Sequence, residues 1–397
     1  MKVVVRPLSD VTDASIDLND FCRGDGQLFV RDGVGVAGRG VAARISGREH
    51  RAFFESLVID APPDAPGARP LLIGALPFDR TQDAQFVMPS TWIAKTDDGQ
   101  AWFGAVDGAT IDASNPQSPR PMGNEFAVRP GVAVDHYLRA VATIRDAVRA
   151  GHITKAVVAR DVEVDATQPI DVHGLLLRLK ASFGSSYRYC FDGLVGASPE
   201  LLVAVSGTQI SSHPLAGTTP RTGDPATDDR LAAELLASPK NQIEHRVVID
   251  MVHDTLLEHC SFLDWEPEPS VVKVANVQHL GTRLVGQLSS PKLTAFDAAT
   301  LLSPTPALGG FPREAALELI ARHEGVARGR YGGAIGWFDD TGDGTFAVTI
   351  RCAELSTDRR HARLFAGGGI VADSDPLAEL AETQAKLQAM LAAIVRP

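Results

Sequence analysis

The chain has 397 residues, a length typical of two or three domains or of one large compact unit. Hydrophobic residues make up 44% of it and charged residues 22%, which excludes a chain that is disordered throughout. The formal net charge of −11 argues against nucleic acid as a partner, because nucleic-acid binders normally carry a basic surplus. An acidic protein can nevertheless hold a small anion through a metal ion.

Targeting signals and cysteine spacing indicate the compartment. No stretch approaches the roughly 18 uninterrupted apolar residues of a membrane span, and the first residues do not have the basic-then-apolar order of a signal peptide. The four cysteines, Cys22, Cys190, Cys260 and Cys352, are widely separated and form no CxxC motif. We therefore expect a cytoplasmic protein with no membrane partner, whose thiols are reduced and mostly buried.

Turn formers divide the first part of the chain. The segments 61–70 and 113–130 are rich in proline and are predicted to be loops or boundaries. Between them, the short apolar runs 71–76 and 101–105 predict strands. We expect residues 1–125 to be a strand-containing N-terminal part of the same compact unit, with a catalytic region over residues 130–397.

Helical and strand patterns alternate after this boundary. A helix is predicted from Val134, with Tyr137, Val141, Ile144 and Val148 on one face and Gly151 in the C-cap region. Strands are predicted at 155–164, 187–191, 201–206 and 209–212, and their short links favour antiparallel pairing. A helical stretch follows over about 228–259, interrupted at Pro239, with an apolar face predicted at Ile243, Val247, Met251 and Thr255.

Three further strands are predicted at 333–338, 345–355 and 363–372. The last helix is expected to begin with Asp375 as N-cap and Pro376 at its first position. Its buried stripe is predicted to consist of Leu377, Leu380, Gln384, Leu387, Leu391 and Ile394.

Read one at a time, the polar residues leave several interpretations open. Glu379 and Glu382 share a helix face with Lys386, as a ligand pair or an ordinary solvated face would. Lys155 opens an apolar strand, where its amine is either desolvated into a useful base or extended to water. The glycines at 367–369 suit a ligand loop and a bulged strand equally well.

Taken in order along the chain, these segments resemble the chorismate-utilising enzymes, and among them isochorismate synthases. The motifs that carry the resemblance are KAVVAR (155–160), GASPELL (196–202), PLAGT (214–218), EH (244–245), QHLGT (278–282), SPTPALGGFP (303–312), YGGAIGW (331–337), TIRCAEL (349–355), LFAGGGIV (364–371) and SDPLAELAETQAKL (374–387). The resemblance covers Val134 to about Met390. It implies an α/β fold of the α+β type, in which two mainly antiparallel sheets pack together with helices outside.

The resemblance also implies a reaction. Members of the family convert chorismate to isochorismate by adding water at C2 of the ring while the C4 hydroxyl leaves. By this resemblance Lys155 is the base for water, and Glu200 is the acid for the leaving group. Glu244 and Glu382 match direct ligands of Mg²⁺, and Glu379 matches a carboxylate that reaches the ion through water.

Further positions match substrate-lining residues of the family. Arg351 matches the residue that grips the enolpyruvyl carboxylate, which a guanidinium group can bind bidentately. The other implied substrate-binding residues are Gly217, Thr218, His279, Ala307, Leu308, Tyr331, Gly368 and Lys386. The resemblance also implies a monomer, because family members of this size are commonly monomers.

Three interpretations stay open at this point. The first is isochorismate synthase. Ala216 stands where aminodeoxychorismate synthases have a nucleophilic lysine, and the Ala307-Leu308 pair resembles the isochorismate-forming branch. Salicylate synthase, which goes on to eliminate pyruvate, is the second interpretation, because QHLGT also resembles that branch. The third is a non-catalytic chorismate-binding relative. The sequence does not say whether isochorismate would serve siderophore or menaquinone biosynthesis.

Overall fold

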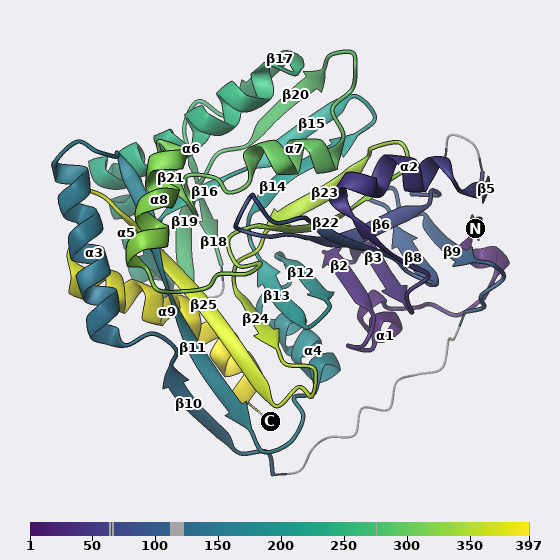
Figure 1. Ribbon diagram of the computed structural model, residues 1–397, viewed down its shortest axis with the longest axis horizontal. Coiled ribbons are helices and arrows are strands. Elements are labelled where there is room, and N and C mark those ends of the chain that lie inside the picture. The colour runs from purple at the N-terminus through teal and green to yellow at the C-terminus, as the bar shows by residue number, and fades with distance from the viewer. Residues whose placement is uncertain (63–64, 66, 112–122, 275, 397) are drawn as a thin grey trace.

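The computed structural model describes residues 1–62, 65, 67–111, 123–274 and 276–396. Two large sheets form its centre, and helices cover their outer faces (Figure 1). All strand pairs in the described residues are antiparallel except that of β1 with β5. This arrangement confirms the fold class predicted from the sequence.

The first sheet has thirteen strands. Its order is β10 (Phe126–Pro130), β11 (Lys155–Ala166), β25 (His361–Ile370), β24 (Cys352–Leu355), β13 (Leu194–Ser198), β12 (Tyr187–Phe191), β2 (Gln27–Arg31), β3 (Val34–Arg39), β8 (Thr91–Lys95), β9 (Ala101–Val106), β1 (Lys2–Pro7) and β5 (Val58–Asp60), with β21 (Gly310–Phe311) beside β11. The long pair β11 and β25 runs in register from Ala156 opposite Ile370 to Asp165 opposite His361.

The second sheet has nine strands, and a third has three. The order of the second is β17 (Cys260–Trp265), β20 (Leu284–Leu288), β15 (Gln209–His213), β14 (Leu201–Ser206), β23 (Gly344–Val348), β22 (Ala334–Asp339), β6 (Leu71–Leu76), β7 (Gln85–Met88) and β4 (Ala43–Ser46). The third consists of β16 (Leu215–Pro220), β19 (Val277–Gly281) and β18 (Ser270–Lys273). Strands β2 and β6 pair with β12 and β22, so early and late parts of the chain share both large sheets.

Nine α-helices occur in the described residues. They are α1 (Leu18–Cys22), α2 (His50–Glu55), α3 (Val134–Arg149), α4 (Val172–Ser182), α5 (Pro225–Ala237), α6 (Pro239–Leu257), α7 (Ala295–Leu302), α8 (Arg313–His323) and α9 (Pro376–Val395), with short 3-10 turns at Leu8–Asp10 and Gly47–Glu49. Helix α9 begins as predicted, because the Asp375 side chain accepts a hydrogen bond from the N–H of Ala378 and Pro376 follows it. No helix in this part of the chain is both long enough and apolar enough to cross a membrane.

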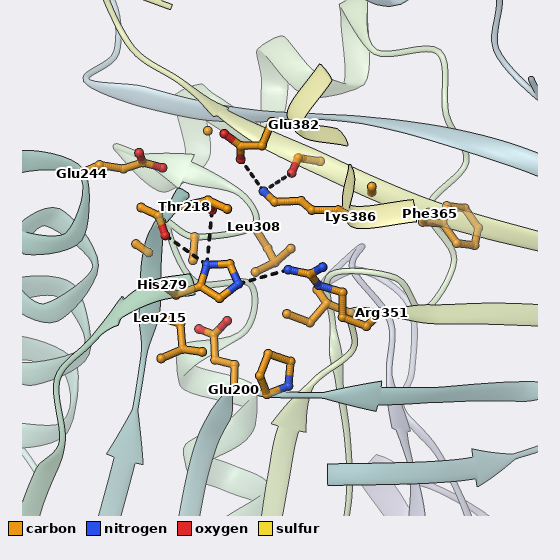
Figure 2. Close-up of a pocket in the computed structure, with 18 of the residues that line it drawn as sticks. Glu200, Leu215, Thr218, Glu244, His279, Leu308, Arg351, Phe365, Glu382 and Lys386 are labelled. Carbon is orange, nitrogen blue, oxygen red and sulfur yellow. Dashed lines mark hydrogen bonds and ion pairs between the residues drawn. The ribbon is translucent and has the colours of Figure 1, made fainter. Parts of the chain in front are cut away.

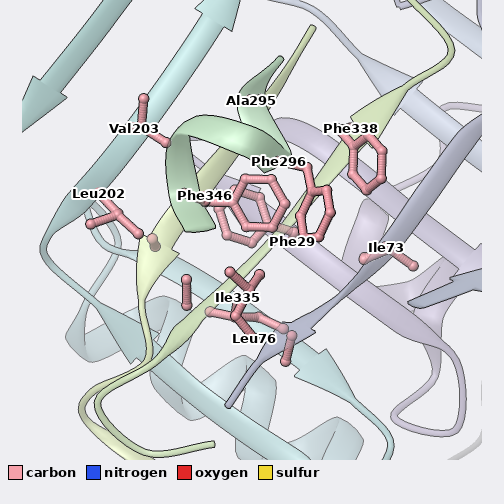
Figure 3. Close-up of a cluster of buried hydrophobic side chains, with 14 of the residues drawn as sticks. Phe29, Ile73, Leu76, Leu202, Val203, Ala295, Phe296, Ile335, Phe338 and Phe346 are labelled. Carbon is pink, nitrogen blue, oxygen red and sulfur yellow. The ribbon is translucent and has the colours of Figure 1, made fainter. Parts of the chain in front are cut away.

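One apolar cluster contains aromatic and aliphatic side chains from both large sheets and from helix α7. Figure 3 shows part of this cluster, in which Phe296 of α7 stacks on Phe338 of β22 at a centroid distance of 5.3 Å. Phe86 of β7 meets Phe338 edge-on at 5.1 Å. Separate apolar clusters lie under α1, α4 and α9 and under α3 and α8. This packing fixes the sheet ends that surround the site described below.

Several sequence predictions need correction. The run 345–355 is two strands, β23 and β24, because Arg351 adopts a left-handed conformation with φ 54° that ends regular pairing. By contrast, the predicted interruption of the stretch 228–259 at Pro239 is confirmed, because Ser238 is the N-cap and Pro239 opens the second of two helices. Residues 126–130, predicted as loop, form β10, while 112–122 of that predicted loop lie outside the described residues, as do 63, 64 and 66 of the segment 61–70.

The buried faces of two helices also differ from the predicted ones. Ile243 of α6 is 62% exposed and Leu377 of α9 is 66% exposed. The buried residues of α6 are His245, Val248, Ile249, Val252 and Leu256, and those of α9 are Glu379, Thr383, Leu387, Met390, Ala393 and Ile394. Polar residues of the two helices therefore face the interior, close to the site that follows.

Candidate active site

A pocket of about 650 Å³, its mouth included, opens between β11, β25, α6, α9 and the ends of β14, β16 and β19 (Figure 2). Its lining consists of Lys155, Pro199, Glu200, Leu215, Ala216, Gly217, Thr218, Glu244, His279, Ala307, Leu308, Tyr331, Ile350, Arg351, Phe365, Ala366, Gly367, Gly369, Glu382 and Lys386. Twelve of the fourteen residues predicted for the site are in this set. The other two, Gly368 and Glu379, lie behind it.

Glu200 places a carboxyl group on the pocket wall between β13 and β14. Its backbone is held by the Ser198 hydroxyl, which accepts from the Glu200 N–H at 3.3 Å, and by the N–H of Val348, which donates to the Glu200 carbonyl at 3.1 Å. The side chain is 3% exposed, and Oε1 has no hydrogen-bond partner in the described residues. Burial raises the pKa of Glu200 from 4.5 to about 8, so this group is a neutral acid at pH 7.

Arg351 and His279 form a second polar group on the facing wall. Arg351 Nη2 donates to His279 Nε2 at 3.1 Å, and His279 Nδ1 therefore carries the proton that it donates to the Gly217 carbonyl at 3.0 Å. Burial and the Arg351 charge lower the pKa of His279 to about 3, which keeps the ring neutral. Figure 2 shows Thr218 beside the same ring nitrogen, at 3.2 Å.

The other arm of the Arg351 guanidinium is available to a ligand. Nη1 is buried and has no hydrogen-bond partner among the residues that the structure describes. Burial lowers the pKa of Arg351 to about 10, so the group is still a cation at pH 7. A buried cation with a free donor that faces a pocket is suited to bind a carboxylate.

Two lysines are ion-paired with carboxylates at the same pocket. Lys155, 1% exposed, lies with Nζ 2.8 Å from Glu244 Oε1. Lys386 Nζ lies 2.6 Å from Glu382 Oε1 and donates to the Gly367 carbonyl at 2.8 Å (Figure 2). Burial opposes ionisation of Glu382, but the positive charges of Lys386, Lys240 and Arg351 together outweigh it and lower the pKa of that carboxyl.

The glycine segment of β25 makes room for two of the carboxylates. A Cβ on Gly369 would lie 2.3 Å from Glu244 Oε1 and 2.7 Å from Lys155 Cε. A Cβ on Gly368 would lie 2.5 Å from Glu379 Oε2, because Gly368 faces α9 and not the pocket. A methyl group added at either position would therefore displace one of these carboxylates from its observed place. Gly367 and Gly369, and not the predicted Gly368, line the pocket.

Glu379 stands behind the wall with a shifted pKa. Its Oε1 accepts from the Ser374 hydroxyl at 2.8 Å and lies 3.7 Å from Lys240 Nζ. Burial, followed by repulsion from Glu382, raises the pKa of Glu379. A cation bound between Glu379 and Glu382 would relieve the repulsion between their carboxylates.

The donor chemistry of Glu244, Glu379 and Glu382 fits a hard divalent cation, which prefers carboxylate oxygen. In the described part of the chain, however, no group of three acidic, histidine or cysteine side chains lies close enough together to hold a metal ion. Glu244 and Glu382 are turned to Lys155 and Lys386 instead. The three carboxylates thus provide suitable ligands that are not gathered around one point.

Several residues of the pocket were not predicted from the sequence. They are Pro199, Leu215, Ala216, Ile350, Phe365, Ala366, Gly367 and Gly369. Phe365 stacks on Tyr331 at 5.1 Å and so forms a wall with a predicted residue. Most of them adjoin a predicted residue in sequence, and this adjacency was the signal that could have identified them.

Comparisons with known proteins identify the family of the chain. The model of the family described as chorismate binding enzyme matches residues 67–395, and the chain belongs to that family. A Mycobacterium tuberculosis protein provisionally named isochorismate synthase MenF is 41% identical, covering 83% of this chain and 87% of its own. The vibriobactin-specific isochorismate synthase of Vibrio cholerae is 35% identical, covering 82% and 79%.

A solved structure extends the likeness to the fold. The menaquinone-specific isochorismate synthase MenF of Escherichia coli superimposes with a TM-score of 0.83 at 23% identity, covering 99% of this chain and 94% of that one. Within the family, the relatives above carry the name of an isomerase, isochorismate synthase. The resemblance predicted from the ordered motifs is confirmed.

Proposed function

We propose that the protein is an isochorismate synthase that takes chorismate as its substrate, like its relatives in vibriobactin and menaquinone biosynthesis. The observation that carries the proposal is the combination, in one pocket, of the neutral acid Glu200, the amine of Lys155 and the unpartnered guanidinium arm of Arg351. An addition of water coupled to departure of a hydroxyl needs a base and an acid at one ring. A dianionic substrate also needs a buried cation.

Each residue then has a defined task. Lys155, once its amine is neutral, accepts a proton from the water that adds at C2 of the ring. Glu200 donates its proton to the C4 hydroxyl, which leaves as water while the ring double bonds shift. One water is added and one is lost, so the reaction is an isomerisation. Arg351, oriented by His279, binds the enolpyruvyl carboxylate, and Lys386, Thr218 and the walls formed by Leu308 and Tyr331 hold the ring.

We also propose that Mg²⁺ is the cofactor, held by Glu244 and Glu382 and through water by Glu379, where it would neutralise the ring carboxylate. The oxygen-only donor set and the raised pKa of Glu379 support this assignment. We further propose a monomer in the cytoplasm. The four cysteines are free, which agrees with a reducing compartment.

The test is incubation of the purified protein with chorismate and Mg²⁺, with and without EDTA, and separation of the products by chromatography and mass. Isochorismate in equilibrium with chorismate, and its loss with EDTA, is the expected result. Early accumulation of salicylate and pyruvate would instead establish salicylate synthase activity. A Lys155→Ala variant should bind chorismate without turning it over, and unchanged turnover would refute the assigned base.

A further inference from the structure

A buried ion pair lies behind the pocket wall. Glu324 and Arg328 follow helix α8 and are 3% and 4% exposed. Arg328 Nε donates to Glu324 Oε1 at 2.7 Å, and Arg328 Nη2 donates to Glu324 Oε2 at 2.5 Å. The desolvation of two buried charges offsets much of their attraction, so net stabilisation alone is a poor explanation for such a pair. Its contacts indicate another role.

The pair takes the place of a missing strand at the edge of β11. Strand β21 pairs with β11 only at Lys155 and Ala156. At the next residue, Arg328 Nη2 donates to the Val157 carbonyl at 2.8 Å, and two residues beyond it the Ala159 N–H donates to Glu324 Oε2 at 2.7 Å. The two side chains supply the donor and the acceptor that a neighbouring strand would supply. They hold the strand that begins with Lys155.

The same guanidinium holds two other walls of the pocket. Arg328 Nη1 donates to the carbonyl of Leu308 at 2.7 Å, and the guanidinium carbon of Arg328 lies 5.9 Å from the centroid of the Tyr331 ring. The Arg328 side chain also lies over the ring of Phe78, 4.1 Å from its centroid. Only a planar group with several fixed donors can make these contacts together, and an ammonium cannot.

We propose that Arg328, oriented by Glu324, is a positioning residue that sets the placement of Lys155, Leu308 and Tyr331 relative to one another. It lines no part of the pocket itself. The kinetic side of this inference rests on the proposed function. Because Arg351 and Lys386, which would bind the substrate charges, are held by other contacts, the chemical step is expected to suffer more than binding.

The first test compares Arg328→Lys with the matched control Arg188→Lys. Arg188 is 2% exposed in the same sheet and donates to Asn19 Oδ1 at 3.3 Å, away from the pocket. Per folded molecule, kcat for chorismate should fall about 10- to 100-fold in Arg328→Lys with KM within about threefold, since misplacement by about 1 Å costs up to 10²-fold. The control should keep kcat within about twofold.

Two further variants separate positioning from folding. Glu324→Gln keeps an acceptor for the Ala159 N–H but loses the charge that orients Arg328. Its kcat should also fall, by less than in Arg328→Lys. Arg328→Ala should regain part of its kcat when millimolar guanidinium chloride is added, whereas Arg188→Ala should not. If Arg328→Ala does not fold, kcat of Arg328→Lys and Glu324→Gln decides whether Arg328 has a positioning role.

Hydrogen exchange provides a readout that does not need turnover. Peptides covering residues 153–160 and 303–311 should exchange faster in Arg328→Lys than in the wild type, while other strands of the sheet stay unchanged. If the wild type does not convert chorismate, the proposed function fails but exchange still tests the positioning. The inference would be overturned if kcat and hydrogen exchange in Arg328→Lys equal those of the wild type. It would also be overturned if Arg328→Lys and Arg188→Lys lose kcat equally and only in proportion to the fraction of unfolded protein.

Discussion

Replacement of Glu200 by glutamine is expected to stabilise the protein while it removes turnover. The carboxyl is 3% exposed, and its pKa rises from 4.5 to about 8 on burial. At pH 7 the unfolded chain carries this group ionised, and folding must protonate it. A difference of about 2.5 pH units corresponds to about 3 kcal/mol. The amide never ionises and has the same shape, so the free energy of unfolding at pH 7 should rise by up to about 3 kcal/mol.

The sign of the pH dependence follows from the raised pKa. In the wild type the contribution of Glu200 to stability is fully present below pH 4.5 and is lost as the pH rises to about 8. The advantage of Glu200→Gln should therefore vanish near pH 4 and be largest above pH 8. Wild-type turnover should also fall as the pH rises through about 8, because the proton donor is lost.

Urea unfolding followed by tryptophan fluorescence at several pH values measures this difference, with chorismate turnover assayed on the same samples. The control is Glu268→Gln, at an exposed side chain, which should change stability by less than about 0.5 kcal/mol. A stability difference that does not vary with pH, or a less stable glutamine variant at pH 7, would refute the assignment of a buried neutral acid.

Other predictions concern the glycine segment, the last helix and the thiols. Gly369→Ala should reduce turnover at least 10²-fold, since its Cβ would displace Glu244 and Lys155. The control Gly184→Ala, whose Cβ would lie 3.4 Å from the nearest backbone atom, should not reduce turnover. Equal activities of the two variants would contradict this prediction. Asp375→Ala should lower the free energy of unfolding by about 1 kcal/mol in a urea titration, and no change would show that the cap is dispensable. A thiol reagent should modify Cys260 before the three buried cysteines, as peptide mass mapping can check.

Much of the fold follows from local pattern. Strands such as 187–191 and 201–206 were predicted with their observed bounds, because aromatic residues in the first and aliphatic residues in the second lie between turn formers and specify them locally. The order of strands in the sheets could not be derived in this way, since β2 meets β12 only through contacts distant in sequence. The resemblance supplied only the general arrangement, two mainly antiparallel sheets with helices outside.

The errors on the helices have a physical cause. Apolar periodicity assigned Leu377 to the buried stripe of α9, but the helix buries the polar residues Glu379 and Thr383 instead, and Glu379 lies behind the pocket. A rule that places apolar residues inside fails where function places carboxylates there. Arg351 is similar, since its left-handed backbone interrupts an apolar run without a glycine to mark the break.

The residues that line the pocket, predicted or missed, lie within the ordered motifs, whereas the ion pair behind the pocket wall is brought there only by the fold. Glu324 and Arg328 have i, i+4 spacing beyond the end of α8, and nothing in their neighbourhood in the sequence indicates that they reach the edge of β11. Such contacts depend on a strand 165 residues earlier. They become visible only when the chain is folded.

The sharing of both large sheets between early and late strands has a consequence for synthesis. Strand β6 gains its partner β22 only after about 260 further residues, and β2 waits about 160 residues for β12. At about 5–20 residues per second, β6 is without this partner on the ribosome for roughly 10 to 50 s. During that time, unpaired strand edges of residues 1–106 are open to pairing with other chains. Production of this protein should therefore respond strongly to chaperone supply and to lower temperature.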